Sequence, residues 1–275
     1  MSLSVGGTVL LAGAGKMGTA LMQGWLARGL PASSILIQEP ALSAETAAVV
    51  SQHGIRAEAA YAALDAPPAV IVAAVKPQVM DQVFAPLAKL AGPDTVVLSI
   101  AAGRSIASFE KHLAPGIAVV RAMPNTPAAI GRGITGAVGN AHLTAAQKAT
   151  CDALLSAVGE VVWVRDEGLI DAGTAVSGSG PAYVFLLAEC LAEAGRAAGL
   201  DAETATALAR ATVSGAGELL HRSPLDAGTL RQNVTSPGGT TAAALAVLMR
   251  DADGLQSLMT EAVLAAKKRG RDLGQ

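Results

Sequence analysis

The sequence contains few aromatic and few charged residues. Of its 275 residues, 3% are aromatic and 15% are charged, whereas 51% are hydrophobic. Small aliphatic side chains must therefore build the core, and so apolar a chain suggests further buried surface, such as a subunit interface. The length suffices for one large domain or two ordinary ones.

Other absences disfavour several classes of protein. The net charge is −2 and no basic block occurs, which argues against a nucleic-acid partner. The two cysteines, Cys151 and Cys190, lack metal-ligand spacing and are expected to be buried thiols in a reducing cytosol. No secretory signal is recognisable, and the longest apolar strand, 69–75, is too short to cross a membrane. We expect a cytoplasmic protein with no membrane partner and no metal.

Residues that commonly act as catalysts are also scarce. Ser179 has no plausible His–Asp partners, and no paired carboxylates converge on the expected ligand crevice. None of the histidines lies in a glycine-rich or strand-end motif; they are His53, His112, His142 and His221. Hydrolytic, metal-dependent and covalent mechanisms therefore have little support.

The first half of the chain alternates apolar strands with helical patterns. Its strands show little polar alternation, which is typical of parallel strands buried on both faces. We predict strands over residues 8–12, 35–38, 55–58, 69–75, 95–100, 117–123, 134–138 and 160–164. A capping box from Thr144 to Gln147 predicts a further helix. The pattern indicates an α/β protein with a Rossmann-type, doubly wound, mostly parallel sheet.

A glycine-rich motif, Gly13-Ala14-Gly15-Lys16-Met17-Gly18, follows the first strand and opens a helix. This is the context that the dinucleotide fingerprint requires: Gly13 allows the turn, Gly15 lets a pyrophosphate approach, and Gly18 permits close helix packing. Glu39 lies 21 residues beyond Gly18, near the position of the acid that binds the adenosine ribose. It favours NADH unless Arg56 or another base intervenes; an exposed turn glutamate is the alternative.

Three later strands end in small residues or proline, where an α/β sheet forms its ligand crevice. The segments are Ala74-Val75-Lys76-Pro77-Gln78, Ala101-Ala102-Gly103 and Pro124-Asn125-Thr126-Pro127. Lys76 is either a ligand contact or an exposed lysine in a turn.

The second half shows helical patterns only. We place the domain boundary in the charged segment that ends at Gly168, giving a dinucleotide-binding domain over 1–166 and an all-α substrate and dimerisation domain over 167–275. A helix over 170–176 is expected to break at Ser177-Gly178-Ser179-Gly180. Alanine-rich helix faces favour close packing between two chains.

The loop from Asn233 to Thr241 contains glycines and hydroxyls, and no charged residue occurs before Leu245. Thr240 or Thr241 is expected to cap the helix that follows. The first N–H groups of that helix can hold an anion such as a carboxylate, although a capped turn is the simpler interpretation.

Taken in order, these motifs resemble those of pyrroline-5-carboxylate reductases, and the resemblance covers nearly the whole chain. They also include Ser99-Ile100, Arg121-Ala122-Met123 and Pro181-Ala182-Tyr183. The resemblance implies a Rossmann domain and a helical domain that interlocks with a second subunit, with dimers as the basic unit and decamers, pentamers of dimers, in some members. It implies hydride transfer from NAD(P)H to the C=N carbon of 1-pyrroline-5-carboxylate, giving proline.

The resemblance also implies roles for individual residues. Cofactor contacts would come from Gly13, Gly15, Lys16, Met17, Gly18, Glu39, Ala74, Val75, Lys76, Pro77, Ala101, Ala102, Gly103 and Asn125. Substrate contacts would come from Ser236, Gly239, Thr240 and Thr241, with Thr241 as the catalytic residue that hydrogen-bonds the ring nitrogen. A cyclic imine is readily protonated, so no strong protein acid is required. The chain departs from many members at Tyr61, where they have asparagine, and at His221-Arg222-Ser223-Pro224.

Two other hypotheses are less consistent with the sequence. A related β-hydroxyacid dehydrogenase or imine reductase would share the architecture, but the hydroxyacid enzyme needs a general acid/base, usually lysine, in the helical domain. No lysine lies between Thr150 and Met249. A non-catalytic nucleotide sensor would give no reason for the hydroxyl-rich loop.

Overall fold

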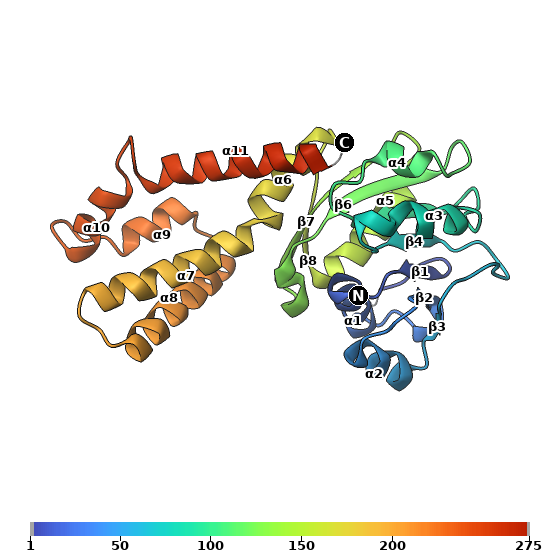
Figure 1. Ribbon diagram of the computed structural model, residues 1–275, viewed down its shortest axis with the longest axis horizontal. Helices are drawn as coiled ribbons and strands as arrows, with labels where there is room; N and C mark the ends of the chain where they lie inside the picture. Colours follow the sequence, from blue (N-terminus) through green and yellow to red (C-terminus); the bar gives the residue numbers. More distant parts are fainter. Residues whose placement is uncertain (1–2, 274–275) are drawn as a thin grey trace. The chain divides into compact units, whose positions relative to one another are not determined.

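The computed structural model describes residues 3–273 and divides into two compact units. The first unit spans Met1–Gly178 and Lys267–Gln275, and the second spans Ser179–Ala266. Figure 1 follows the chain through the helices and strands of each unit.

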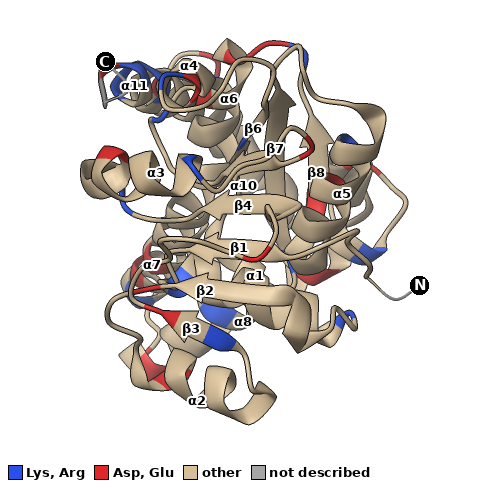
Figure 2. Ribbon diagram, turned by 90° about the vertical axis from the view of Figure 1, so that its right-hand side faces the viewer, with Lys and Arg blue, Asp and Glu red and all other residues tan. Residues whose placement is uncertain are grey.

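One eight-stranded sheet forms the centre of the first unit, in the order β3-β2-β1-β4-β5-β6-β7-β8. The strands are β1 (Val9–Ala12), β2 (Ile35–Gln38), β3 (Arg56–Glu58), β4 (Val70–Ala73), β5 (Val96–Ser99), β6 (Ala118–Met123), β7 (Gly133–Gly139) and β8 (Gly159–Trp163). Only the β6–β7 pair is antiparallel among the neighbours in this sheet. The predicted Rossmann-type, mostly parallel sheet is confirmed, with a strand at each predicted place. Figure 2 shows β3, β2, β1 and β4 side by side.

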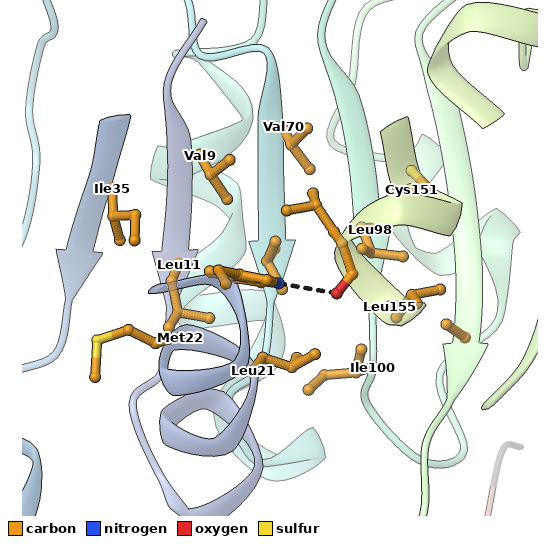
Figure 3. Close-up of a cluster of buried hydrophobic side chains, with 14 of the residues drawn as sticks. Val9, Leu11, Leu21, Met22, Ile35, Val70, Leu98, Ile100, Cys151 and Leu155 are labelled. Carbon is orange, nitrogen blue, oxygen red and sulfur yellow. Dashed lines mark hydrogen bonds between the residues drawn. The ribbon is translucent and has the colours of Figure 1, made fainter. Parts of the chain in front are cut away.

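Helices cover both faces of the sheet, which explains the apolar strands. Every residue of β1, β2, β4 and β5 is buried. On one face, α1 (Lys16–Ala27) and α5 (Ala145–Leu155) contribute Leu21 and Leu155 to the same buried cluster as Leu11 of β1 (Figure 3). On the other face, α3 (Met80–Ala88) and α4 (Ile106–Glu110) contribute Phe84 and Phe109, whose rings meet edge to face.

Two polar features fix these helices. The indole of Trp25 in α1 donates to the backbone oxygen of Leu154 in α5 at 2.9 Å, so the two helices are joined as well as packed. The predicted capping box opens α5, with Thr144 and Gln147 bonding reciprocally. A separate helix, α2 (Ala44–His53), begins at Ser43, whose hydroxyl accepts from Thr46 N.

The helix that follows the sheet is interrupted within the predicted segment, but over fewer residues than the sequence predicts. α6 (Gly168–Gly173) continues through a π-helical turn, η5 (Thr174–Gly178), and α7 (Gly180–Ala197) begins two residues later. The predicted break is confirmed at Ser179, which separates η5 from α7, but it is shorter than predicted, because Ser177 and Gly178 remain in the π-helical turn. Asn125 Nδ2 donates to Ser177 O at 3.1 Å, and Thr174 Oγ1 donates to Ile170 O at 2.7 Å.

The second unit is helical. After α7 come α8 (Ala202–Arg222), α9 (Ala227–Asn233), α10 (Thr240–Leu248) and α11 (Leu255–Leu273), whose last turns belong to the first unit. Asp201 caps α8, accepting from Thr204 N, and α7 packs beside α8 with Gly195 against Ala205 (Figure 1).

Most apolar side chains of the second unit are uncovered in a single chain. Ala205 and Ala209 are its only buried hydrophobic residues in the described part of the chain, whereas Phe185 is 63% exposed. The prediction that Cys190 is buried is wrong for the single chain, because its helix presents this face to solvent. Such apolar helix faces require a further partner surface.

By length and composition alone, one helical run, Gly168–Ala197, could cross a membrane. Near its start, Asp171 pairs with Arg121 of β6 inside the sheet unit, and further along, the exposed Glu193 and Arg196 pair with each other. Its uncovered apolar residues therefore fit a helix–helix contact between subunits equally well.

We predict that the two thiols differ sharply in reactivity. Burial, with a smaller contribution from the charge of Asp152, raises the pKa of the Cys151 thiol to about 12, and only the thiolate is nucleophilic. In a Cys190→Ser variant, a thiol reagent at mildly alkaline pH should therefore react only after denaturant is added. Rapid reaction of the native Cys190→Ser protein would contradict this burial.

Candidate active site

The turn at Gly13 joins three strand ends. Its φ is 95°, and a Cβ there would lie 2.7 Å from the backbone carbonyl of Ala74, so only glycine permits this turn and approach. Gly13 N donates to Gln38 O at 2.9 Å, and Ala74 N donates to Ala12 O at 2.8 Å. The ends of β1, β2 and β4 consequently form one continuous edge, where the strand order reverses.

The start of α1 forms an open cradle beside this turn. Gly15 is the N-cap, makes no side-chain cap, and would leave an added Cβ with nothing within 4 Å. Lys16, Met17 and Gly18 form the first turn, whose N–H groups have no partners within the helix and carry its positive dipole end. A helix start of this kind, open in front of Gly15, is suited to binding an anion such as a pyrophosphate.

Glu39 lies at the end of β2 with its carboxylate fixed by backbone amides. Oε2 accepts from Ala14 N at 3.0 Å and Oε1 accepts from Ala41 N at 3.2 Å. The half-buried carboxylate is thus held against the glycine-rich loop, which separates it from an ordinary exposed turn glutamate.

An ion pair connects the loops that follow β4 and β5. Asp81, one residue into α3, pairs with Arg104, which follows the Ala101–Gly103 segment, and also lies 3.2 Å from His112 Nε2. The hydrogen bond from Arg104, and then that from His112, holds the pKa of Asp81 below its usual value. The loop over 74–78, with Lys76 exposed, and the loop over 101–103 are thereby held in a common arrangement.

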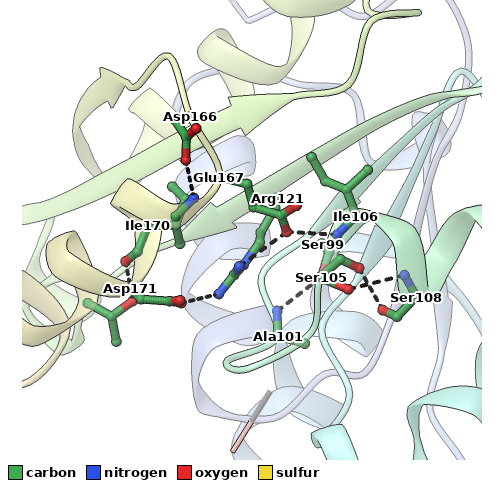
Figure 4. Close-up of polar contacts among 12 residues, drawn as sticks. Ser99, Ala101, Ser105, Ile106, Ser108, Arg121, Asp166, Glu167, Ile170 and Asp171 are labelled. Carbon is green, nitrogen blue, oxygen red and sulfur yellow. Dashed lines mark hydrogen bonds and ion pairs between the residues drawn. The ribbon is translucent and has the colours of Figure 1, made fainter. Parts of the chain in front are cut away.

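A buried cation anchors the far side of the same edge (Figure 4). Arg121 of β6, with 9% of its side chain exposed, places Nη1 3.1 Å from Glu167 Oε1 and Nη2 2.7 Å from Asp171 Oδ1. Glu167 also accepts from Ile106 N, the first residue of α4, at 2.8 Å. Sequence reasoning missed this network; the available signal was a charged residue inside an apolar strand, which must be paired when buried.

Both polar atoms of the Asn125 side-chain amide form hydrogen bonds. Nδ2 donates to Ser177 O at 3.1 Å and Oδ1 accepts from Ile134 N at 2.9 Å. These bonds join the end of β6 to the π-helical turn and to β7. Direct cofactor contact by Asn125 stays a prediction, and the bonds observed are supporting ones.

In the second unit, the hydroxyl-rich loop forms a tight turn onto α10. Gly238 has a φ of 68°, Gly239 N donates to Ser236 O at 3.1 Å, and Gly239 is the N-cap of α10 without a side-chain bond. The predicted threonine cap is wrong, because Thr240 and Thr241 are the first two residues inside the helix. Their amides still lack intrahelical partners and can bind an anion.

These features define a class of protein. A doubly wound sheet with a dinucleotide cradle, followed in sequence by a helical unit that exposes apolar faces, is typical of a two-domain NAD(P)-dependent oxidoreductase. Residues 8–103 match the family model described as NADP oxidoreductase, coenzyme F420-dependent, and residues 167–273 match pyrroline-5-carboxylate reductase dimerisation. The pyrroline-5-carboxylate reductase of Pseudomonas aeruginosa is 41% identical over 96% of this chain and 95% of its own. The chain belongs to the pyrroline-5-carboxylate reductase family.

Solved structures that resemble this chain include members of the same family. A pyrroline-5-carboxylate reductase from Coxiella burnetii is 33% identical and superposes with a TM-score of 0.87, covering 98% of this chain and 99% of that one. A pyrroline carboxylate reductase from Plasmodium falciparum, solved with NADP bound, is 26% identical with a TM-score of 0.77 and the same coverage. The predicted family, its NAD(P) cofactor and its homo-oligomeric assembly are confirmed.

Two glycine variants should separate folding from cofactor binding. Gly13→Ala should lower the free energy of unfolding by about 2 kcal/mol or more, because alanine is strained at this φ. Gly15→Ala should change it by less than about 0.5 kcal/mol, since the space is open, but should weaken NADH binding about tenfold or more by blocking the cradle. Urea unfolding and titration calorimetry measure the two effects; unchanged NADH binding in Gly15→Ala would contradict the cradle.

Proposed function

We propose that the chain reduces the C=N bond of 1-pyrroline-5-carboxylate to L-proline with hydride from NAD(P)H, the last step of proline biosynthesis. The observation that carries this proposal is family membership over 96% of the chain. The open backbone cradle at Gly15 and the anion-binding start of α10 supply the two binding features that the reaction needs.

We assign the cofactor to the first unit, within a dinucleotide-binding domain over residues 1–166. The cradle from Gly13 to Gly18, including Lys16 and Met17, would hold the pyrophosphate, and Glu39 would bind the adenosine ribose. The loops at 74–77 and 101–103 would border the nicotinamide, with Asn125 close by. Bound NAD(P)H supplies the hydride, while these residues orient the cofactor and keep it in place.

The substrate would be bound by the helical domain over residues 167–275. The first N–H groups of α10 would take its carboxylate, with Ser236, Gly239 and Thr240 around the ring. The Thr241 hydroxyl would bond the ring nitrogen and orient it, or relay a proton from water. A cyclic imine that is already protonated accepts hydride without a strong protein acid, which suits a loop with no charged residue.

We further propose a cytoplasmic homodimer as the basic unit, closed by the apolar helix faces of the second unit. Phe185, 63% exposed, and Leu264, 59% exposed, would be covered there. The free thiols of Cys151 and Cys190 are compatible with a reducing compartment. Light scattering at several protein concentrations distinguishes a dimer from a pentamer of dimers.

The proposed reaction has a direct test. Purified protein mixed with 1-pyrroline-5-carboxylate should oxidise NADH or NADPH, followed by loss of the absorbance of the reduced nicotinamide, and proline should accumulate in equal amount. Cofactor oxidation without proline, or no oxidation of either dinucleotide, would refute the proposal.

Removal of one hydroxyl tests the substrate loop. Thr241→Ala should lower kcat/KM about tenfold or more, the scale of one lost transition-state hydrogen bond at roughly 1.4 kcal/mol. Thr241→Ser retains a hydroxyl and should keep most of the activity. Thr235→Ala is the matched control, because the Thr235 hydroxyl already donates to Arg231 O at 2.6 Å. Equal kinetics for Thr241→Ala and wild type would remove Thr241 from the mechanism.

A further inference from the structure

Glu39 lies at the point where the two nicotinamide dinucleotides differ. NADPH carries a phosphate on the adenosine ribose where NADH has a hydroxyl, and an acid at the end of the second strand is placed to meet that group. Glu39 cannot turn away freely, because Ala14 N and Ala41 N hold its two oxygens at 3.0 and 3.2 Å. A fixed carboxylate accepts a hydrogen bond from the hydroxyl and repels the phosphate.

Few bases are close enough in sequence to offset this repulsion. The segment from Glu39 to Thr46, which follows β2, contains no lysine or arginine. The next arginine along the chain is Arg56 on the adjacent strand β3. In the strand register Arg56 lies opposite Leu36, two residues before the end of β2. An arginine could therefore meet a 2′-phosphate here only if Arg56 extended toward the strand ends.

The Arg56 guanidinium instead contacts side chains close to it on and after β3. Its guanidinium carbon lies 5.1 Å from the ring centroid of Tyr61, and its Nε lies 3.5 Å from Glu58 Oε1. The Arg56–Glu58 pair is solvent-exposed and weak by itself, with 57% and 49% of the side chains accessible. The stacking on Tyr61 adds to it.

Tyr61 is a fixed platform for this stacking. Only 4% of Tyr61 is exposed. Its backbone N donates to Gln38 Oε1 at 2.9 Å, and its hydroxyl donates to Arg56 O at 3.3 Å. Burial raises the pKa of the Tyr61 hydroxyl, an effect that the Arg56 charge partly offsets, so it stays a neutral donor. The ring is thus tied to both β2 and β3.

Glu58 adds a second acid to the same edge. It lies at the end of β3 opposite Gln38, and its backbone oxygen accepts from Glu39 N at 3.0 Å. Figure 2 shows β3 beside β2 with both basic and acidic positions on it. The ends of β2 and β3 therefore carry two acids, Glu39 and Glu58, and the arginine of β3 is already paired with one of them.

We propose that this protein binds and uses NADH in preference to NADPH, with Glu39 as the specificity-determining residue and with Tyr61 and Glu58 keeping Arg56 from compensating. This inference rests on the proposed seat of the dinucleotide over the Gly13–Gly18 loop. It assigns to Tyr61 the role of holding Arg56 at its position on β3.

Equilibrium binding of NADH and NADPH, without substrate, tests the preference. Titration calorimetry should give a dissociation constant at least about tenfold lower for NADH in the wild type. Glu39→Gln removes the charge and keeps the size, so it should tighten NADPH binding and bring the ratio within about threefold of unity. A wild-type ratio near one, or a ratio that Glu39→Gln leaves unchanged, would overturn the proposal.

A second pair of variants tests the role of Tyr61. Tyr61→Leu should release Arg56 and tighten NADPH binding, with a stronger dependence on salt, while NADH binding changes little. Adding Arg56→Ala to Tyr61→Leu should abolish that gain; a gain that persists would rule out Arg56 as its source. Thermal unfolding of each variant verifies that it is folded before titration.

These measurements separate the preference from the activity. Tight NADH binding without reduction of 1-pyrroline-5-carboxylate would refute the proposed function and leave the preference standing. Turnover with equal affinity for both dinucleotides would refute the preference and leave the proposed function standing. Absence of binding by either dinucleotide would overturn both.

Discussion

The left-handed turn at Gly13 is the constraint on which the arrangement of the β1, β2 and β4 ends depends. Its backbone touches Ala74, its amide bonds to Gln38 O, and the next residue, Ala14, bonds to Glu39. A side chain at this one position would separate the ends of β1, β2 and β4, and with them the backbone cradle, the Glu39 carboxylate and the loop after β4. The proposed dinucleotide site is therefore formed mainly by the backbone, and the selectivity proposed for it comes from the side chains around it.

Much of the fold could be predicted because strands buried on both faces must be apolar, and because glycine and proline mark their ends. The same local logic found the interruption within Ser177-Gly178-Ser179-Gly180 but overestimated its extent. These residues favour a turn, yet the bond from Asn125 Nδ2 to Ser177 O and the packing of Met123 against Gly178 keep the backbone helical. No local pattern reports a contact made from more than fifty residues away, so the π-helical turn could be found only in the structure.

Some features of the candidate site could likewise be predicted from the sequence, and others could not. Its glycines and the offset of Glu39 are visible in the sequence, since they follow from the geometry of one strand–loop–helix unit. The orientation of the Glu39 carboxylate, and the pairing of Arg121 with acids 46 and 50 residues later, come from tertiary structure. Thr240 and Thr241 were correctly located near the helix start, but which residue becomes the cap depends on the conformation of Gly239, not on the side chains available.

The scarcity of charge in the 233–245 loop has a chemical reason in the proposed mechanism. The reacting imine is most easily reduced when its nitrogen is protonated, so it carries positive charge close to its own carboxylate. A lysine or arginine placed to bind that carboxylate would lie within a few ångströms of the iminium and oppose its protonation. Backbone amides at the start of α10 bind the carboxylate with partial charges only, and a threonine hydroxyl can accept a hydrogen bond from the protonated nitrogen. A neutral, hydroxyl-lined helix start therefore suits this substrate better than a cationic one, and hydride delivery then depends on how well the two bound molecules are positioned.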